Sequence, residues 1–110
     1  MTASRKELTV VGCGFAAKYP EGGGNFSVPL QYLLGLRRMR RPALWLEIMH
    51  STGDVGLDTR VAATFRRRLQ EFDLDHSYCL IIFPKGSTSQ EFAGCRFFGM
   101  TRRKLEDLLE

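Results

Sequence analysis

Three short apolar segments, separated by two amphipathic ones, restrict most strongly how this chain can fold. The segments read ELTVVGCG (7–14), ALWLEIM (43–49) and YCLIIFP (78–84). Their β-branched and aromatic residues are typical of buried strands. The second segment has few polar positions, so we expect this strand to be covered on both faces of the sheet. The third segment is the most apolar in the chain.

A helix is predicted between the first two segments. Ser27 is its expected N-cap. Pro29 then falls in the first turn, where its missing N–H would have had no partner, and Pro42 ends the helix. Its apolar row recurs at helical spacing and consists of Leu30, Leu33, Leu34 and Met39.

A second helix is predicted between the second and third segments, with Asp58 or Thr59 as its N-cap. A third should begin after Thr101, and the pattern of EFAGCRFFGM (91–100) assigns that stretch to neither helix nor strand. The apolar stripe of the second helix consists of Val61, Phe65, Leu69 and Phe72.

Strands that alternate with helices predict an α/β fold with right-handed crossovers. We expect a Rossmann-like three-layer sandwich with a short parallel sheet, spanning residues 1–110 as a single domain. Because the final predicted helix is followed by no strand, the sequence looks like half of a doubly wound domain. The first strand should lie at the edge of the sheet, so we expect a homo-oligomer or a partner chain that covers it.

Composition excludes several classes of protein. The three cysteines, Cys13, Cys79 and Cys95, are far apart and form no CxxC pair, so neither a disulfide framework nor a zinc site is expected. The polar start, MTASRKEL, does not resemble a signal peptide, and no apolar run is long enough for a membrane span. A cytoplasmic protein without metal or cofactor is therefore expected.

The chain is basic, with a formal net charge of +4. This charge permits acidic partners, including nucleic acid. However, the arginine clusters at 37–41, 66–68 and 102–104 fall on the polar sides of predicted helices, close to acidic residues. A basic nucleic-acid-binding module is therefore an alternative rather than the main expectation.

A glycine-rich loop follows the first predicted strand. Ligands of open parallel sheets bind at the carboxyl ends of the strands, where glycines let backbone N–H groups approach a phosphate or a sugar hydroxyl. We therefore expect a ligand at this loop; a structural or interaction domain without a ligand is the alternative. The candidate binding residues are Gly14, Gly22, Gly23, Gly24 and Asn25.

The same region formally matches a dinucleotide motif. GCGFAA (12–17) fits G-x-G-x-x-G/A directly after a strand. That motif requires its helix to begin within it, whereas here Pro20 and three glycines intervene. A dinucleotide cofactor is therefore not expected.

A wider resemblance covers most of the chain. YPEGGGNFSVPLQYLLGLRR (19–38), followed by a strand ending in WLE, resembles the amino-terminal domain of a bacterial glycosyltransferase-like family with the two-domain GT-B fold. LDTRVAATFRRRLQEFDLDHSYCL (57–80) is similar to that family's second helix and third strand, and FFGMTRRKLEDLL (97–109) to its next segment. Arg41-Pro42 departs from the family's Gly-His helix ending.

The resemblance implies a function. The segment 22–25 would face an interdomain cleft, and Glu47, at the end of the second strand, would face the same cleft. A complete enzyme would transfer a sugar from a nucleotide-sugar to an acceptor lying against the glycine loop. In GT-B enzymes the carboxyl-terminal domain holds most of the donor, so we expect this chain alone to bind rather than to catalyse.

Few residues are candidates for catalysis. Glu47 could act as a general base or bind a hydroxyl, or it could form a structural hydrogen bond. His50 could act as a base oriented by Asp54, or be a solvated loop histidine. His76 is expected on the surface at the other end of the sheet, and Cys13 has no identifiable histidine partner.

Overall fold

The computed structural model describes residues 8–14, 16–18, 24–88 and 91–109. The candidate residues Gly22 and Gly23 lie outside these ranges. The elements along the chain are β1 (Thr9–Cys13), α1 (Gly24–Arg38), β2 (Ala43–His50), α2 (Val55–Gln70), β3 (Tyr78–Phe83), β4 (Arg96–Phe98) and α3 (Arg102–Leu109).

A sheet of order β1-β2-β3-β4 forms the middle layer. The first three strands are parallel, with Val11 beside Trp45 and Trp45 beside Tyr78. Strand β4, from the stretch that the sequence pattern left unassigned, runs antiparallel to β3. The predicted α/β class is confirmed, but the sheet is mixed rather than wholly parallel.

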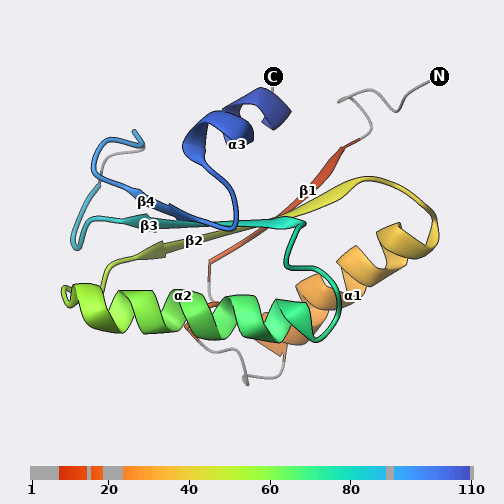
Figure 1. Ribbon diagram of the computed structural model, residues 1–110, viewed down its shortest axis with the longest axis horizontal. Coiled ribbons are helices and arrows are strands. Elements are labelled where there is room, and N and C mark those ends of the chain that lie inside the picture. The colour runs from red at the N-terminus through yellow and green to blue at the C-terminus, as the bar shows by residue number, and fades with distance from the viewer. Residues whose placement is uncertain (1–7, 15, 19–23, 89–90, 110) are drawn as a thin grey trace.

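The helices cover the two faces of the sheet unequally. Helices α1 and α2 lie together on one face, and α3 lies on the other (Figure 1). Strands β1, β2 and β3 follow one another in order across the sheet, so two crossovers of the same hand place both helices on the same side. The expected three layers are present.

An aromatic cluster fills the space between the sheet and the first two helices. Phe65 of α2 makes edge-on contacts with Trp45 and Tyr78, at ring-centroid distances of 5.4 and 5.6 Å. Phe26 of α1 lies 5.2 Å from Trp45. These four side chains are at most 2% exposed, so they anchor both helices to β2 and β3.

The opposite face of the sheet is buried only in part. Strand β3 is buried along its whole length, as predicted, and Leu105 of α3 packs in the cluster that covers it. By contrast, Val10 of β1 and Ile48 of β2 are each 39% exposed. The expectation that β1 is buried and that β2 is covered on both faces is therefore wrong at these positions, because the cluster around Leu105 of α3 includes Leu44 at the start of β2 but neither Val10 nor Ile48.

The starts of two helices differ from those expected. Helix α1 begins at Gly24 rather than after Ser27, so Pro29 lies inside the helix instead of in its first turn. Helix α2 begins after Asp54, whose Oδ1 accepts a hydrogen bond from the Leu57 amide at 3.1 Å. The N-cap of α2 is therefore neither Asp58 nor Thr59, which both lie inside the helix. Several residues in each region have capping side chains, and local pattern does not decide between them.

The end of α1 also differs, whereas the start of α3 is as predicted. Met39 does not continue the buried row; it follows the last residue of α1 and is 62% exposed. At α3 the Lys104 amide donates to Thr101 Oγ1 at 3.1 Å, which confirms that cap. The described helices are shorter than a membrane requires: none has the length and hydropathy needed to cross one.

Candidate functional site

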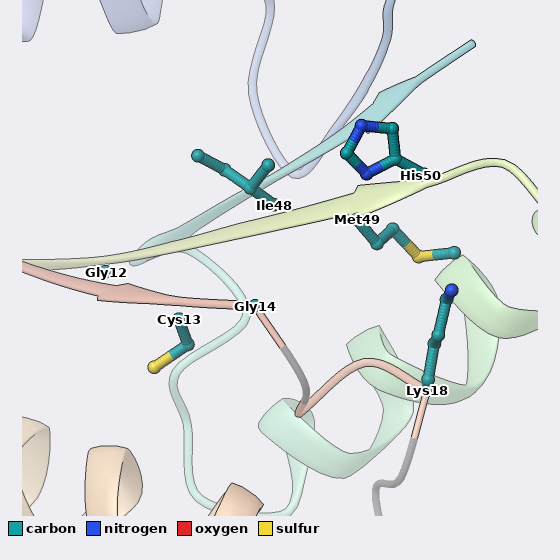
Figure 2. Close-up of a pocket in the computed structure, with 7 residues that line it drawn as sticks. All are labelled: Gly12, Cys13, Gly14, Lys18, Ile48, Met49 and His50. Atoms are coloured by element: carbon teal, nitrogen blue, oxygen red, sulfur yellow. The ribbon is translucent and has the colours of Figure 1, made fainter. Parts of the chain in front are cut away.

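A hollow of about 610 Å³ lies where β1 and β2 end. Because the two strands are parallel, their carboxyl ends meet at the same edge of the sheet, where ligands of open α/β sheets bind. Figure 2 shows the residues that line the hollow: Gly12, Cys13, Gly14, Lys18, Ile48, Met49 and His50.

Two glycines open the hollow on the β1 side. Gly12 and Gly14 lie two residues apart, so they belong to the same face of the extended chain. A Cβ atom at Gly12 would meet nothing within 4 Å, and one at Gly14 would meet only the Ile48 carbonyl oxygen, at 3.6 Å. The fold itself does not require glycine at Gly12, and the bare backbone is accessible to a ligand.

Residues of β2 and the loop after β1 provide the other walls. Successive residues of β2 point to opposite faces, so Ile48 and His50 lie on one side of the strand and Met49 on the other (Figure 2). Lys18 lies on the Met49 side, with its ammonium group directed toward the end of β2 (Figure 2). The hollow thus combines an apolar wall with an ammonium and an imidazole group, both on exposed residues.

A backbone carbonyl, rather than the predicted Asp54, orients His50. The Nε2–H of His50 donates to the Ser87 carbonyl at 3.1 Å, and the ring lies 5.8 Å from that of Phe83. The carboxylate of Asp54 instead caps α2. The hydrogen bond at Nε2 leaves Nδ1 as the acceptor nitrogen of the neutral ring.

Glu47 lies behind the hollow and does not line it. Its side chain is fully buried, with Oε1 accepting from Trp45 Nε1 and Oε2 from the Ala17 amide, each at 2.9 Å. Burial raises the pKa of this carboxyl, and hydrogen bonds from Ala17, Trp45 and Ala16 only partly offset the increase. Glu47 therefore faces the core rather than a cleft, and its contacts hold the chain segment that leads into Lys18.

Asp58 is a second buried carboxylate. The sequence predicted it only as a possible helix cap. Ser51 Oγ donates to its Oδ2, and the Thr52 amide and hydroxyl donate to its Oδ1 at 2.9 and 2.8 Å. Burial raises the pKa of Asp58, but these hydrogen bonds and the charge of Arg96 bring it below its ordinary value. The carboxylate fixes the loop after His50.

The signal for this cluster was present in the sequence. Ser51 and Thr52 follow a strand directly and precede an acidic residue within the first turn of a helix. Short hydroxyl side chains in such loops commonly bond locally to carboxylates and amides. The pattern does not reveal that the carboxylate would be buried, since that depends on packing between α2 and the sheet.

Cys13 lines the hollow as a neutral thiol. Burial, together with the negative charge of Glu47, raises its pKa to about 11. A thiol with this pKa is protonated at neutral pH, and the thiolate is the nucleophilic form. Cys13 is therefore in the less reactive, protonated form.

The other predicted site residues are distributed unevenly. Gly14 and His50 both line the hollow, whereas Gly24 and Asn25 form the start of α1. His76 is exposed and lies before the amino-terminal end of β3, at the end of the sheet away from the hollow, as expected. Lys18, Ile48 and Met49 were missed, because no sequence motif marks them.

Among the residues that the structure describes, no group of three or more His, Cys, Asp or Glu side chains is placed so that it could bind a metal ion. The chain was also compared with protein-family models, with curated proteins and with solved structures. None of these matches it.

Proposed function

We propose that this chain is a glycosyltransferase-like, acceptor-side domain that binds a sugar or a phosphate-containing ligand where β1 and β2 end. The observation that carries the proposal is the hollow itself, whose lining combines bare glycine backbone with the side chains of Lys18 and His50. The resemblance of residues 19–38 to GT-B amino-terminal domains supports the same region as the ligand-facing edge.

The chemistry of the walls fits such a ligand. The ammonium group of Lys18 can bind a phosphate or another anion as a point charge, and Nδ1 of the neutral His50 ring can accept a hydrogen bond from a sugar hydroxyl. Ile48, which is 39% exposed, provides apolar surface for the carbon face of a sugar ring. Both buried carboxylates already accept hydrogen bonds from this chain, so we assign neither of them a catalytic role and propose binding alone.

Substitution of Lys18 tests the proposal. With a hexose 1-phosphate and a nucleoside diphosphate hexose as probes, we expect millimolar ligand to raise the Tm of the wild-type chain, since a ligand that binds only the folded state stabilises it. Lys18→Ala should weaken binding about tenfold, a loss of about 1.4 kcal/mol, as measured by calorimetric titration.

Lys104→Ala is the matched control, because Lys104 is an exposed lysine of α3 outside the hollow. It should bind both probes as the wild type does. The proposal would be overturned if the two variants lost the same amount of affinity. It would also be overturned if the wild type bound neither of the two probes. A nucleic-acid module would instead bind oligonucleotides with an affinity that falls steeply with salt.

A second proposal concerns the edge of the sheet. Within the described residues β1 pairs only with β2, and its five residues, TVVGC, include no charge or proline that would discourage pairing. We therefore propose that two chains associate along β1.

Light scattering tests this association. The wild type should have the mass of a dimer at high concentration, and Val10→Lys should have the mass of a monomer. Val55→Lys, at an exposed position of α2, is the control and should have the mass of a dimer. A monomeric wild type would refute the proposal.

A further inference from the structure

Helix α1 carries a second apolar stripe that its own fold does not use. Val28, Tyr32 and Met39, in and directly after the helix, are 54%, 65% and 62% exposed. Together with Gly35 they follow a spacing of four, three and four residues, which is the spacing of a helix–helix seam. A hollow of about 450 Å³ lies along this face, lined by Val28, Gln31, Tyr32, Gly35, Leu36 and Met39.

The core does not require this stripe, because α1 packs on the sheet through different residues. Phe26, Leu30 and Leu33 are at most 8% exposed and form the buried row. A surface helix of a globular domain normally has one apolar face and one polar face. Contiguous exposed apolar side chains, by contrast, mark an interaction surface.

Gly35 gives the stripe its concave shape. A glycine inside a helix costs about 1 kcal/mol relative to alanine, so its presence there needs a reason. Packing of this chain does not supply one, because a Cβ at Gly35 would meet nothing within 4 Å. A gap of this kind between Tyr32 and Leu36 is a socket that can receive a side chain from a second helix.

The charges around the stripe specify the kind of partner. Residues 24–42 contain four arginines and no acidic residue. Arg37 Nη1 donates to the Phe72 carbonyl at 2.7 Å and so turns toward the end of α2. Arg40 and Arg41 are exposed just after the stripe ends, and within the part of the chain that the structure describes, no acidic side chain lines the separate hollow that they share with Leu74.

We propose that the stripe of α1, defined by Val28, Tyr32, Gly35, Leu36 and Met39, docks an amphipathic helix with acidic flanks from a partner protein. Leucine-sized side chains of that helix would enter the socket at Gly35, and its carboxylates would meet Arg40 and Arg41. The inference is independent of the ligand proposed for the hollow between β1 and β2.

Two other occupants fit the stripe less well. A second copy of α1 packed in parallel would bring the arginines at 37–41 of the two chains together, and their charges would repel. In an antiparallel pair these arginines would lie beside the amino terminus of the other helix, which is the positive end of its dipole. A lipid surface offers no side chain to fill a socket. The heptad-like spacing and the concave centre favour a helix.

A designed peptide tests the proposal with a defined probe. The probe is a fluorescent, helix-stabilised 18-residue peptide with leucines at a and d and glutamates at e and g, and its control has lysine in place of every glutamate. Anisotropy titration should show at least tenfold tighter binding of the acidic peptide. Gly35→Leu, which adds a side chain at a position where a Cβ would meet nothing within 4 Å, should weaken that binding at least tenfold, and so should Arg40→Glu combined with Arg41→Glu.

Val55→Ala is the control variant, because Val55 is 66% exposed on α2, away from the stripe. It should bind the acidic peptide as the wild type does, and circular dichroism should show the same helix content in all variants. Equal binding of the two peptides would overturn the proposal. So would binding to phosphatidylglycerol vesicles that Gly35→Leu abolishes, or a dimer mass that Gly35→Leu reduces to that of a monomer.

Discussion

Glu47→Ala is expected to lower the free energy of unfolding by about 3 kcal/mol, as measured by urea denaturation. The substitution leaves the buried Trp45 Nε1–H and Ala17 N–H without their acceptor and creates a cavity beneath the hollow. Each buried donor left unpaired costs about 1 to 3 kcal/mol, and the cavity adds to this loss. The loss should therefore exceed that from any exposed substitution proposed above.

Two matched variants separate the contributions of volume, hydrogen bonding and charge. Glu47→Leu fills the cavity but pairs neither donor, so it should remain less stable than the wild type. Glu47→Gln retains one acceptor and should cost about 1 to 2 kcal/mol. Full stability in Glu47→Leu would show that the hydrogen bonds of the carboxylate contribute nothing.

The same carboxyl group should make stability depend on pH. Burial raises its pKa in the folded chain above the ordinary value of a glutamate. The folded state therefore favours the protonated form. The stabilisation is complete below the unfolded pKa and is lost as the pH rises through the folded pKa. The free-energy difference between the wild type and Glu47→Gln should fall as the pH rises across that window, and a constant difference would contradict this assignment.

Gly99→Ala is expected to cost about 3 kcal/mol. Gly99 follows β4 with a φ of 89°, and a Cβ there would lie 2.6 Å from the Tyr78 carbonyl oxygen. A left-handed conformation costs an ordinary residue about 1 to 2 kcal/mol, and forcing atoms into filled space adds about 1 to 3 kcal/mol.

Gly86→Ala isolates the backbone contribution. Its φ is 73°, also left-handed, but a Cβ there would meet nothing within 4 Å. Denaturation should therefore show a loss of about 1 kcal/mol for Gly86→Ala. If the two variants lose the same stability, the close approach between the end of β4 and the start of β3 has no energetic role.

The sequence allowed the fold class, the three parallel strands and the burial of β3 to be predicted, because hydrophobic periodicity depends on neighbouring residues alone. Strand β4 was missed because RFF is only three residues long and its pairing with β3 is set by the chain reversal before it. The start of α1 was missed because Gly24 and Asn25 carry no strong helix signal. In both cases tertiary contacts, rather than local preference, decide the structure.

The candidate site could be predicted only in part. Its location followed from the rule that ligands bind at the carboxyl ends of parallel strands, which identified Gly14 and His50. The resemblance to GT-B domains placed Glu47 in a cleft, but position along a strand does not tell which face a side chain takes when the register is unknown. Lys18 could not be found, since a lone lysine in a loop has no distinguishing pattern.

The unequal covering of the sheet has a consequence for how binding and rigidity are related. Strand β3 is enclosed on both sides, whereas the β1 edge has cover from only one layer and the proposed ligand lies at its end. The free energy of local unfolding should therefore be lowest at β1, and a bound ligand would stabilise the part of the molecule that unfolds most readily. The proposed ligand would therefore stabilise the least protected strand, and its binding would change the dynamics of the domain more than its shape.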